Sequence, residues 1–204
     1  VVGRFFGGSE KTGMGWDGVD YNTAYGINGA DRRYNPAGEY TTTAADGSDS
    51  TAYYPNQTDN YAQQHAQLSV LHRFTPQWSL SATAHYTHGA GYYEQYKRKK
   101  LSYWGIPYSH KAYGMYRKQL DNHFFGGVVA AKYISEPVDV QFGGAANYYM
   151  GDHFGTLHYL EDSLILPINY EYYRNDAKKT DANIYAKANW RIINRAQEKL
   201  SLYA

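Results

Sequence analysis

The residues best suited to bind a ligand are the cations and tyrosines between positions 90 and 118. This stretch carries seven lysines and arginines but a single acid, Glu94. Cationic side chains attract anions at long range, and tyrosine rings offer faces for stacking and cation–π contacts. We therefore expect the stretch to contribute to the capture of an anionic ligand that carries aromatic groups. The candidate ligand-binding residues are Tyr92, Tyr93, Tyr96, Lys97, Arg98, Lys99, Lys100, Tyr113 and Arg117.

The same basic and aromatic composition is compatible with different roles. The cations could contact the phosphates of lipopolysaccharide, or they could simply solvate a loop. Cations interleaved with aromatic rings are also typical of platforms that bind single-stranded nucleic acid. A one-sided arrangement of the long loops, which the strand pattern predicts, disfavours that interpretation, so we expect no nucleic-acid partner.

A second set of chemically capable residues pairs an acid with a histidine. Asp121 lies near His123, and Asp152 precedes His153. We expect both pairs at the ends of paired strands, as candidates for a site at the rim of the sheet. A carboxylate beside an imidazole can bind a metal or support hydrolysis, but hydrogen bonding at the rim of a sheet is the more common role. The chain contains neither Gly-x-Ser-x-Gly nor His-Glu-x-x-His. We therefore expect no catalytic residue, no metal and no cofactor, and the protein is not expected to be an enzyme.

Composition sets limits on the class of protein. The 204 residues are enough for one domain, and a formal net charge of +1 favours no charged partner. The mean hydropathy is −0.70, and no apolar run is long enough for a transmembrane helix. The chain has 24 tyrosines and no cysteine, which excludes disulfides. The start at Val1 has no signal peptide, so we expect a mature chain or an internal piece.

Residues 78–89 alternate between two kinds of side chain. Apolar residues occupy the even positions from Trp78 to Tyr86, and polar residues occupy the odd positions between and after them. A period of two predicts a strand with one apolar and one polar face. Residues 61–74 alternate in the same way and lead into a turn at 75–77. Pairing the two stretches sets Phe74 opposite Trp78, Val70 opposite Ala82, Leu68 opposite Ala84 and His65 opposite Thr87.

The same pattern continues along the chain. Residues 119–134 and 138–151 form a second predicted hairpin, in which Ile134 lies opposite Pro137 and Lys132 beside Asp139. A strand at 181–193 and a short turn at 194–198 lead to a last strand from 199 onwards. Long loops are expected at 7–61, 90–118 and 152–179, and within the first of these the part at 41–51 has a composition compatible with disorder.

Short and long connections alternate strictly in this scheme. All short turns then lie at one end of the sheet and all long loops at the other, which is the layout of outer-membrane barrels. A soluble β-sandwich distributes its loops more evenly. The predicted fold is therefore all-β, an antiparallel up-and-down transmembrane β-barrel portion with short periplasmic turns and long extracellular loops. The predicted lipid-facing residues are Trp78, Ala82, Ala84, Ile184, Ala188 and Trp190, and the predicted lumen-facing residues are Ser81, His85, Asn183 and Lys187.

Several stretches resemble the TonB-dependent receptors of Gram-negative outer membranes. The resemblance implies a 22-stranded barrel plugged by an N-terminal domain, of which residues 1–204 would be a middle portion without the plug. The stretches are 11–19 (KTGMGWDGV), 33–40 (RYNPAGEY), 56–61 (NQTDNY), 85–97 (HYTHGAGYYEQYK), 120–125 (LDNHFF), 151–155 (GDHFG) and 172–175 (YYRN).

The resemblance implies active import of a scarce ligand, such as a ferric siderophore or another iron or cofactor complex. The expected partners are that small molecule or metal chelate, outer-membrane lipid and lipopolysaccharide, and the TonB complex acting through the absent N-terminal region. The expected location is the outer membrane of a Gram-negative bacterium. Two alternatives stay open: a soluble, tyrosine-rich β-domain that binds carbohydrate, and an outer-membrane enzyme built on the acid–histidine pairs.

Overall fold

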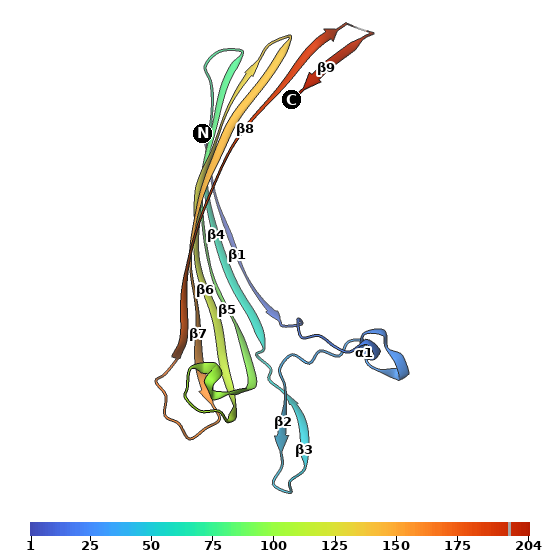
Figure 1. Cartoon of the computed structure of the whole chain (residues 1–204), viewed down its shortest axis with the longest axis vertical. Helices are drawn as coiled ribbons and strands as arrows, with labels where there is room; N and C mark the ends of the chain where they lie inside the picture. The colour runs from blue at the N-terminus through green and yellow to red at the C-terminus, as the bar shows by residue number, and fades with distance from the viewer. Residues whose placement is uncertain (196) are drawn as a thin grey trace.

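The chain is an all-β protein built on one antiparallel, up-and-down sheet. The computed structural model describes residues 1–195 and 197–204, and its main sheet has seven strands in the order β1-β4-β5-β6-β7-β8-β9. Figure 1 shows a tall, curved, single-layered sheet, with α1 and the separate β2–β3 hairpin projecting near one end. The strands are β1 (Val2–Gly13), β2 (Glu39–Thr43), β3 (Asp49–Tyr53), β4 (Thr58–Arg73), β5 (Trp78–Lys100), β6 (Lys111–Ile134), β7 (Val138–Leu160), β8 (Tyr170–Asn194) and β9 (Lys199–Tyr203); the helices are α1 (Tyr21–Tyr25) and the 3₁₀ turns η1 (Ile27–Gly29) and η2 (Leu101–Trp104).

The central strands are much longer than predicted. Strands β5 to β8 have 23 to 25 residues each, whereas a strand of about 9–11 residues would cross a bilayer. The predicted loops at 90–118 and 152–179 are therefore wrong in extent, because only 101–110 and 161–169 lie between strands. The alternation that marks a strand disappears beyond Tyr86, where both faces become polar, although the backbone stays extended.

The predicted loop at 7–61 is also more ordered than expected. Strand β1 continues to Gly13 and β4 begins at Thr58. The interpretation of 41–51 as disordered is wrong, because this part forms the β2–β3 hairpin. Its cross-strand side chains bond to one another, with Thr42 Oγ1 at 2.8 Å from Ser50 Oγ. Its turn is closed by Asp46, which accepts a hydrogen bond from the Ser48 amide at 2.9 Å.

The register predicted for the first hairpin is confirmed. Val70 pairs with Ala82, Leu68 with Ala84 and His65 with Thr87. At the turn, the Phe74 amide donates to the Trp78 carbonyl at 3.0 Å. The apolar side chains of the two strands therefore share one face.

The register predicted for the second hairpin is wrong by two residues. Ile134 lies opposite Asp139, and Lys132 lies opposite Gln141 rather than beside Asp139. The Ser135 hydroxyl explains the shift, because it donates to the Val138 carbonyl at 3.0 Å and accepts from the Val138 amide at 3.3 Å. Pro137 has no amide hydrogen to give to a ladder and is left in the turn. A shift of two residues keeps every side chain on its predicted face.

The connections sort by length as predicted. The turns at 74–77 and 135–137 lie at one end of the sheet, and the longer segments 14–57, 101–110 and 161–169 lie at the other (Figure 1). The predicted turn at 194–198 includes residue 196, which lies outside the described residues. Among the residues that are described, no helix is long and apolar enough to cross a membrane.

Strand pairing creates two faces of opposite character. On one face, called the band face, the apolar even positions of β5 from Trp78 to Tyr86 pair with the apolar odd positions of β6 from Tyr133 to Phe125. The opposite face, called the polar face, carries hydrogen-bonded pairs such as Ser69–Thr83. The predicted division of these residues between two faces is confirmed: Trp78, Ala82, Ala84, Ile184, Ala188 and Trp190 share the band face, and Ser81, His85, Asn183 and Lys187 share the polar face. That the band face contacts lipid and the polar face lines a lumen stays a prediction.

The main cluster of buried apolar residues lies at the end with the longer connections. Turn η2 folds back so that Trp104, which has no exposed surface, packs with Tyr116 and Leu157. Gly114 leaves room for this ring, because a Cβ at position 114 would come within 2.6 Å of Trp104. The 101–110 connection is therefore held to the sheet by a packed core.

We predict that Gly114→Ala lowers the free energy of unfolding by about 1–3 kcal/mol, because the methyl group overpacks the Trp104 contact. Gly127→Ala in the same strand is the matched control, since its Cβ would meet nothing closer than 3.5 Å. Denaturant unfolding of both variants measures the difference. Equal stability of the two variants would contradict the packing described for Trp104.

Candidate functional site

Strand alternation separates the nine predicted ligand-binding residues into two groups. The pairing of β5 with β6 places six of them on the band face and three on the polar face. A single ligand on one face cannot contact both groups. The band-face members are Tyr92, Tyr96, Arg98, Lys100, Tyr113 and Arg117, and the polar-face members are Tyr93, Lys97 and Lys99.

The polar-face members belong to a larger basic and aromatic cluster. We call Tyr93, Lys97, Lys99, Tyr103 and Lys118 the polar-face cluster. The Lys99 and Lys118 ammonium groups lie 5.4 and 5.8 Å from the centre of the Tyr103 ring. Burial lowers the pKa of Lys118, but hydrogen bonds and electrostatic attraction from Tyr103 and Tyr93 outweigh burial and raise it. Lys118 is therefore a cation at neutral pH and beyond.

One cation of the cluster is already neutralised by the long 14–57 connection. Lys97 Nζ lies 3.1 Å from both carboxylate oxygens of Asp17. The neighbouring Trp16 packs edge-on against Tyr93, with ring centres 5.2 Å apart. Among the described residues, Lys99 and Lys118 contact a ring instead of a carboxylate, so their positive charges are not neutralised by an acid.

Three of the band-face members, Tyr96, Arg98 and Tyr113, line a cleft beneath the β2–β3 hairpin. The cleft has a volume of about 710 Å³. The Tyr96 and Tyr113 rings stack at 5.2 Å and 15°, and Tyr40 of β2 meets Tyr96 edge-on at 5.0 Å. Burial, followed by the charge of Glu161, raises the pKa of Tyr96 to about 12, so its phenol stays neutral. The charged lining is balanced between two cations and two acids, Arg98, Lys111, Asp49 and Glu161.

Arg117 and Tyr92 are engaged by the protein itself. Glu94 is 1% exposed, and its carboxylate accepts from Arg117 Nε at 2.7 Å. Tyr54 Oη and Asn56 Nδ2 donate to the same carboxylate, which ties the segment after β3 to β5. The Arg117 guanidinium also lies 4.1 Å from the Tyr92 ring centre. These contacts give both side chains a structural role that the sequence pattern did not reveal.

The four acid–histidine residues are not at a rim. The prediction that they lie at strand ends is wrong, because β6 and β7 extend well past them. His153 lies on the polar face, 3.2 Å from Tyr149 Oη. Asp152, on the band face, accepts from Arg174 Nη1 at 3.1 Å.

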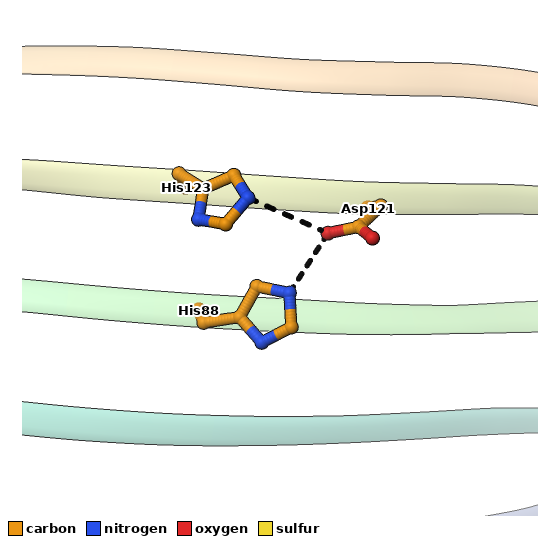
Figure 2. Close-up of side chains that lie close together, drawn as sticks. All are labelled: His88, Asp121 and His123. Atoms are coloured by element: carbon orange, nitrogen blue, oxygen red, sulfur yellow. Dashed lines mark hydrogen bonds and ion pairs between the residues drawn. The ribbon is translucent and has the colours of Figure 1, made fainter.

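Asp121 and His123 are brought together with a residue that sequence reasoning missed. Figure 2 shows His88 of β5 and His123 of β6 both directed at the Asp121 carboxylate. His88 pairs directly with His123 across the two strands. Pairing β5 with β6 in the sequence would have placed His88 opposite His123. Because residues 90–118 were predicted to be a loop, no register between these two strands was predicted.

Acid should release the β2–β3 hairpin. Burial raises the pKa of Glu94, but the hydrogen bonds from Tyr54, Arg117 and Asn56 outweigh it, so the pKa lies below its usual value. A depressed carboxyl pKa stabilises the fold fully above the unfolded value of about 4.3, and this stability is lost as pH falls through the lower folded value. Because the chain has no cysteine, spin labels on Ala45→Cys, in the exposed hairpin turn, and on Tyr108→Cys report the hairpin position. The distribution of distances between the two labels should broaden as pH falls through the folded pKa.

Glu94→Gln is the control for that titration. It removes the charge while keeping the shape of the side chain, and it should cost about 1–3 kcal/mol of folding stability at neutral pH because Arg117 loses its partner. In this variant, the distribution of distances between the two labels should already be broad at neutral pH. An unchanged separation across the acid range in the parent protein would show that Glu94 does not hold the hairpin.

Comparisons with known proteins add no identification. No protein-family model, no curated protein and no solved structure matches this chain. The function is therefore inferred from the faces of the sheet, the polar-face cluster and the placement of the connections.

Proposed function

We propose that the sheet is part of the wall of a transmembrane β-barrel, with the band face toward lipid and the polar face toward the lumen. The observation that carries this proposal is an apolar belt that none of the described residues covers. Ile184 is 91% exposed and Val129 49% exposed, and no second layer lies over the middle of the sheet in Figure 1. An apolar surface of this extent marks an interface with lipid or another apolar surface.

The dimensions of the belt support a bilayer as its partner. Eight residue steps separate Trp78 from Tyr86 on β5, which is roughly 27 Å along the strand at a rise of about 3.4 Å per residue. The apolar band of outer-membrane barrels is about 25 Å tall and is bordered by aromatic girdles. Tyr86, Phe125 and Tyr148 align across three strands at one border of the belt. Trp78 and Tyr133 stand opposite each other at the other border.

The connections and edges support the same orientation. In a barrel, the short turns would be periplasmic and the longer segments extracellular. Strands β1 and β9 lie at opposite edges of the sheet. Backbone N–H and C=O groups within the hydrocarbon layer must all be hydrogen-bonded, because lipid offers them no partner. We therefore expect further strands beside β1 and β9, so that residues 1–204 form one sector of the barrel.

We infer active transport as the activity, on the basis of the resemblance to TonB-dependent receptors. The polar-face cluster lies at the end of the sheet that would be extracellular, on the side that would face the lumen. Two ammonium groups beside tyrosine rings suit an anionic, aromatic chelate such as a ferric siderophore. Import would be energised by the TonB complex through an N-terminal region, and the band-face cleft, with balanced charge, would face outward toward lipopolysaccharide.

The soluble, carbohydrate-binding alternative is less well supported. Tyrosine rings suit sugar stacking, but a soluble domain must shield its apolar side chains from water. The belt from Trp78 to Tyr86 has no protein layer over it among the described residues. The barrel proposal accounts for this belt, and the soluble alternative does not.

Two adjacent valines test which face contacts lipid. Val129→Arg on the band face should lower the free energy of unfolding in phospholipid vesicles by about 2–4 kcal/mol, because it places a cation in the hydrocarbon region. Val128→Arg is the matched control, since Val128 is similarly exposed at 43% but lies on the polar face. It should change stability little. Equal costs for the two variants would count against the lipid assignment.

Cation replacement tests which group captures ligand. Lys99→Ser with Lys118→Ser should slow association of a ferric catecholate at low salt by up to about tenfold and much less at high salt, because exposed charges act through steering. Arg98→Ser with Lys111→Ser removes the same net charge from the band-face cleft and should slow association less. Stopped-flow fluorescence quenching in the intact protein measures both. A larger effect from the cleft variant would move the ligand site to the band face.

A further inference from the structure

Three metal-ligand side chains converge on the band face just beyond the aromatic border. His88 Nε2 lies 2.8 Å from Asp121 Oδ1, and His123 Nε2 lies 3.8 Å from the same oxygen (Figure 2). One potential ligand atom from each residue lies within 4.8 Å of the others. The two imidazole rings stack with centres 4.8 Å apart and planes at 25°, and both Nε2 atoms approach the same Asp121 oxygen.

The second nitrogen of each histidine has its own partner. His88 Nδ1 lies 3.2 Å from Gln64 Oε1, and His123 Nδ1 lies 2.7 Å from Tyr86 Oη. An amide oxygen can only accept, so the bond to Gln64 places a proton on His88 Nδ1, and a metal at Nε2 would take the place of the hydrogen that Nε2 donates to Asp121. Tyr86 Oη can accept from His123 in the same way. Outer partners of this kind orient histidines that bind metals and fix their tautomer.

The separations suit a small divalent ion. Tetrahedral bonds of about 2.0–2.1 Å to nitrogen and oxygen place neighbouring ligand atoms about 3.3 Å apart. The two observed separations from Asp121 Oδ1, 2.8 and 3.8 Å, bracket that value. All three ligand atoms lie within 4.8 Å of one another, so rotation of these half-exposed side chains would complete the geometry without moving the strands.

We propose that His88, Asp121 and His123 form a binding site for a divalent transition metal of the Zn²⁺ class. Two imidazoles and one carboxylate select such an ion over Mg²⁺ and Ca²⁺, which prefer oxygen ligands. Three protein ligands leave a fourth position for water or for an oxygen of an external molecule. The ion would link β5 to β6 two residue pairs beyond Tyr86, on the face opposite to His153 and the polar-face cluster. The site does not depend on the membrane assignment.

Zinc binding by the purified protein tests the site directly. Isothermal titration with Zn²⁺ should show one ion per chain, and Co²⁺ should give the intense visible absorption of a four-coordinate centre. Mg²⁺ and Ca²⁺ should produce neither signal. Asp121→Asn with His123→Ala should abolish both signals. His85→Ala and His153→Ala are matched controls, because these histidines lie on the polar face, and they should leave binding unchanged.

The outer partners provide a readout that a purely structural cluster would not give. Gln64→Ala and Tyr86→Phe keep all three ligands and should weaken Zn²⁺ binding by about 10–100-fold each. Circular dichroism on every variant checks that strand content is retained. Absence of stoichiometric Zn²⁺ binding in the parent protein overturns the proposal and leaves Asp121 as a hydrogen-bond acceptor for two histidines. Binding that survives Asp121→Asn with His123→Ala, or that disappears with His153→Ala, overturns it as well.

Discussion

The register between neighbouring strands is the constraint on which every other feature of this sheet depends. Side chains alternate between faces, so a slip of one residue would exchange the apolar belt with the hydrogen-bonded polar face. The pairs Leu68–Ala84 and Ala84–Gly127 hold three strands in step across the belt. The same alignment, continued past Tyr86, brings His88 opposite His123 and separates Lys99 from Arg98. The side chains that meet on this sheet are therefore determined by strand pairing rather than by closeness in the sequence.

The extent to which the sequence predicted the fold depended on how different the two faces are. Between Trp78 and Tyr86 one face is apolar and the other polar, and the strand, its partner and their register all followed from that contrast. Beyond Tyr86 the contrast disappears, and the extended backbone of residues 90–100 could not be distinguished from a loop. The two-residue error at the β6–β7 turn had a different cause. A single hydroxyl, Ser135, selected the closing pair, and apolar alternation is unaffected by a slip of two.

The candidate sites were predictable in composition but not in arrangement. The basic and aromatic character of 90–118 was evident, yet its division between faces required the strand to continue to Lys100. The buried interactions of Glu94 could not be predicted either. No feature of the nearby sequence identifies Arg117 as its ion-pair partner or Asn56 as a donor to the same carboxylate. His88 was missed for the same reason as Lys99, since its importance arises only when β5 is laid beside β6. Long-range pairing was the missing information in each case.

The length of the central strands has a consequence for where ligand capture would take place. From Tyr86 to Lys100, β5 continues for fourteen residue steps, which is about 48 Å of unbroken strand at a rise of roughly 3.4 Å per residue. In the proposed orientation the central strands would extend well beyond the membrane on the extracellular side, and the polar-face cluster would lie near their far ends. Such a height would lift the cluster clear of the lipid headgroups. A bulky chelate could then be intercepted before it reached the membrane surface, and it would travel the rest of the way along a wall already lined with polar side chains.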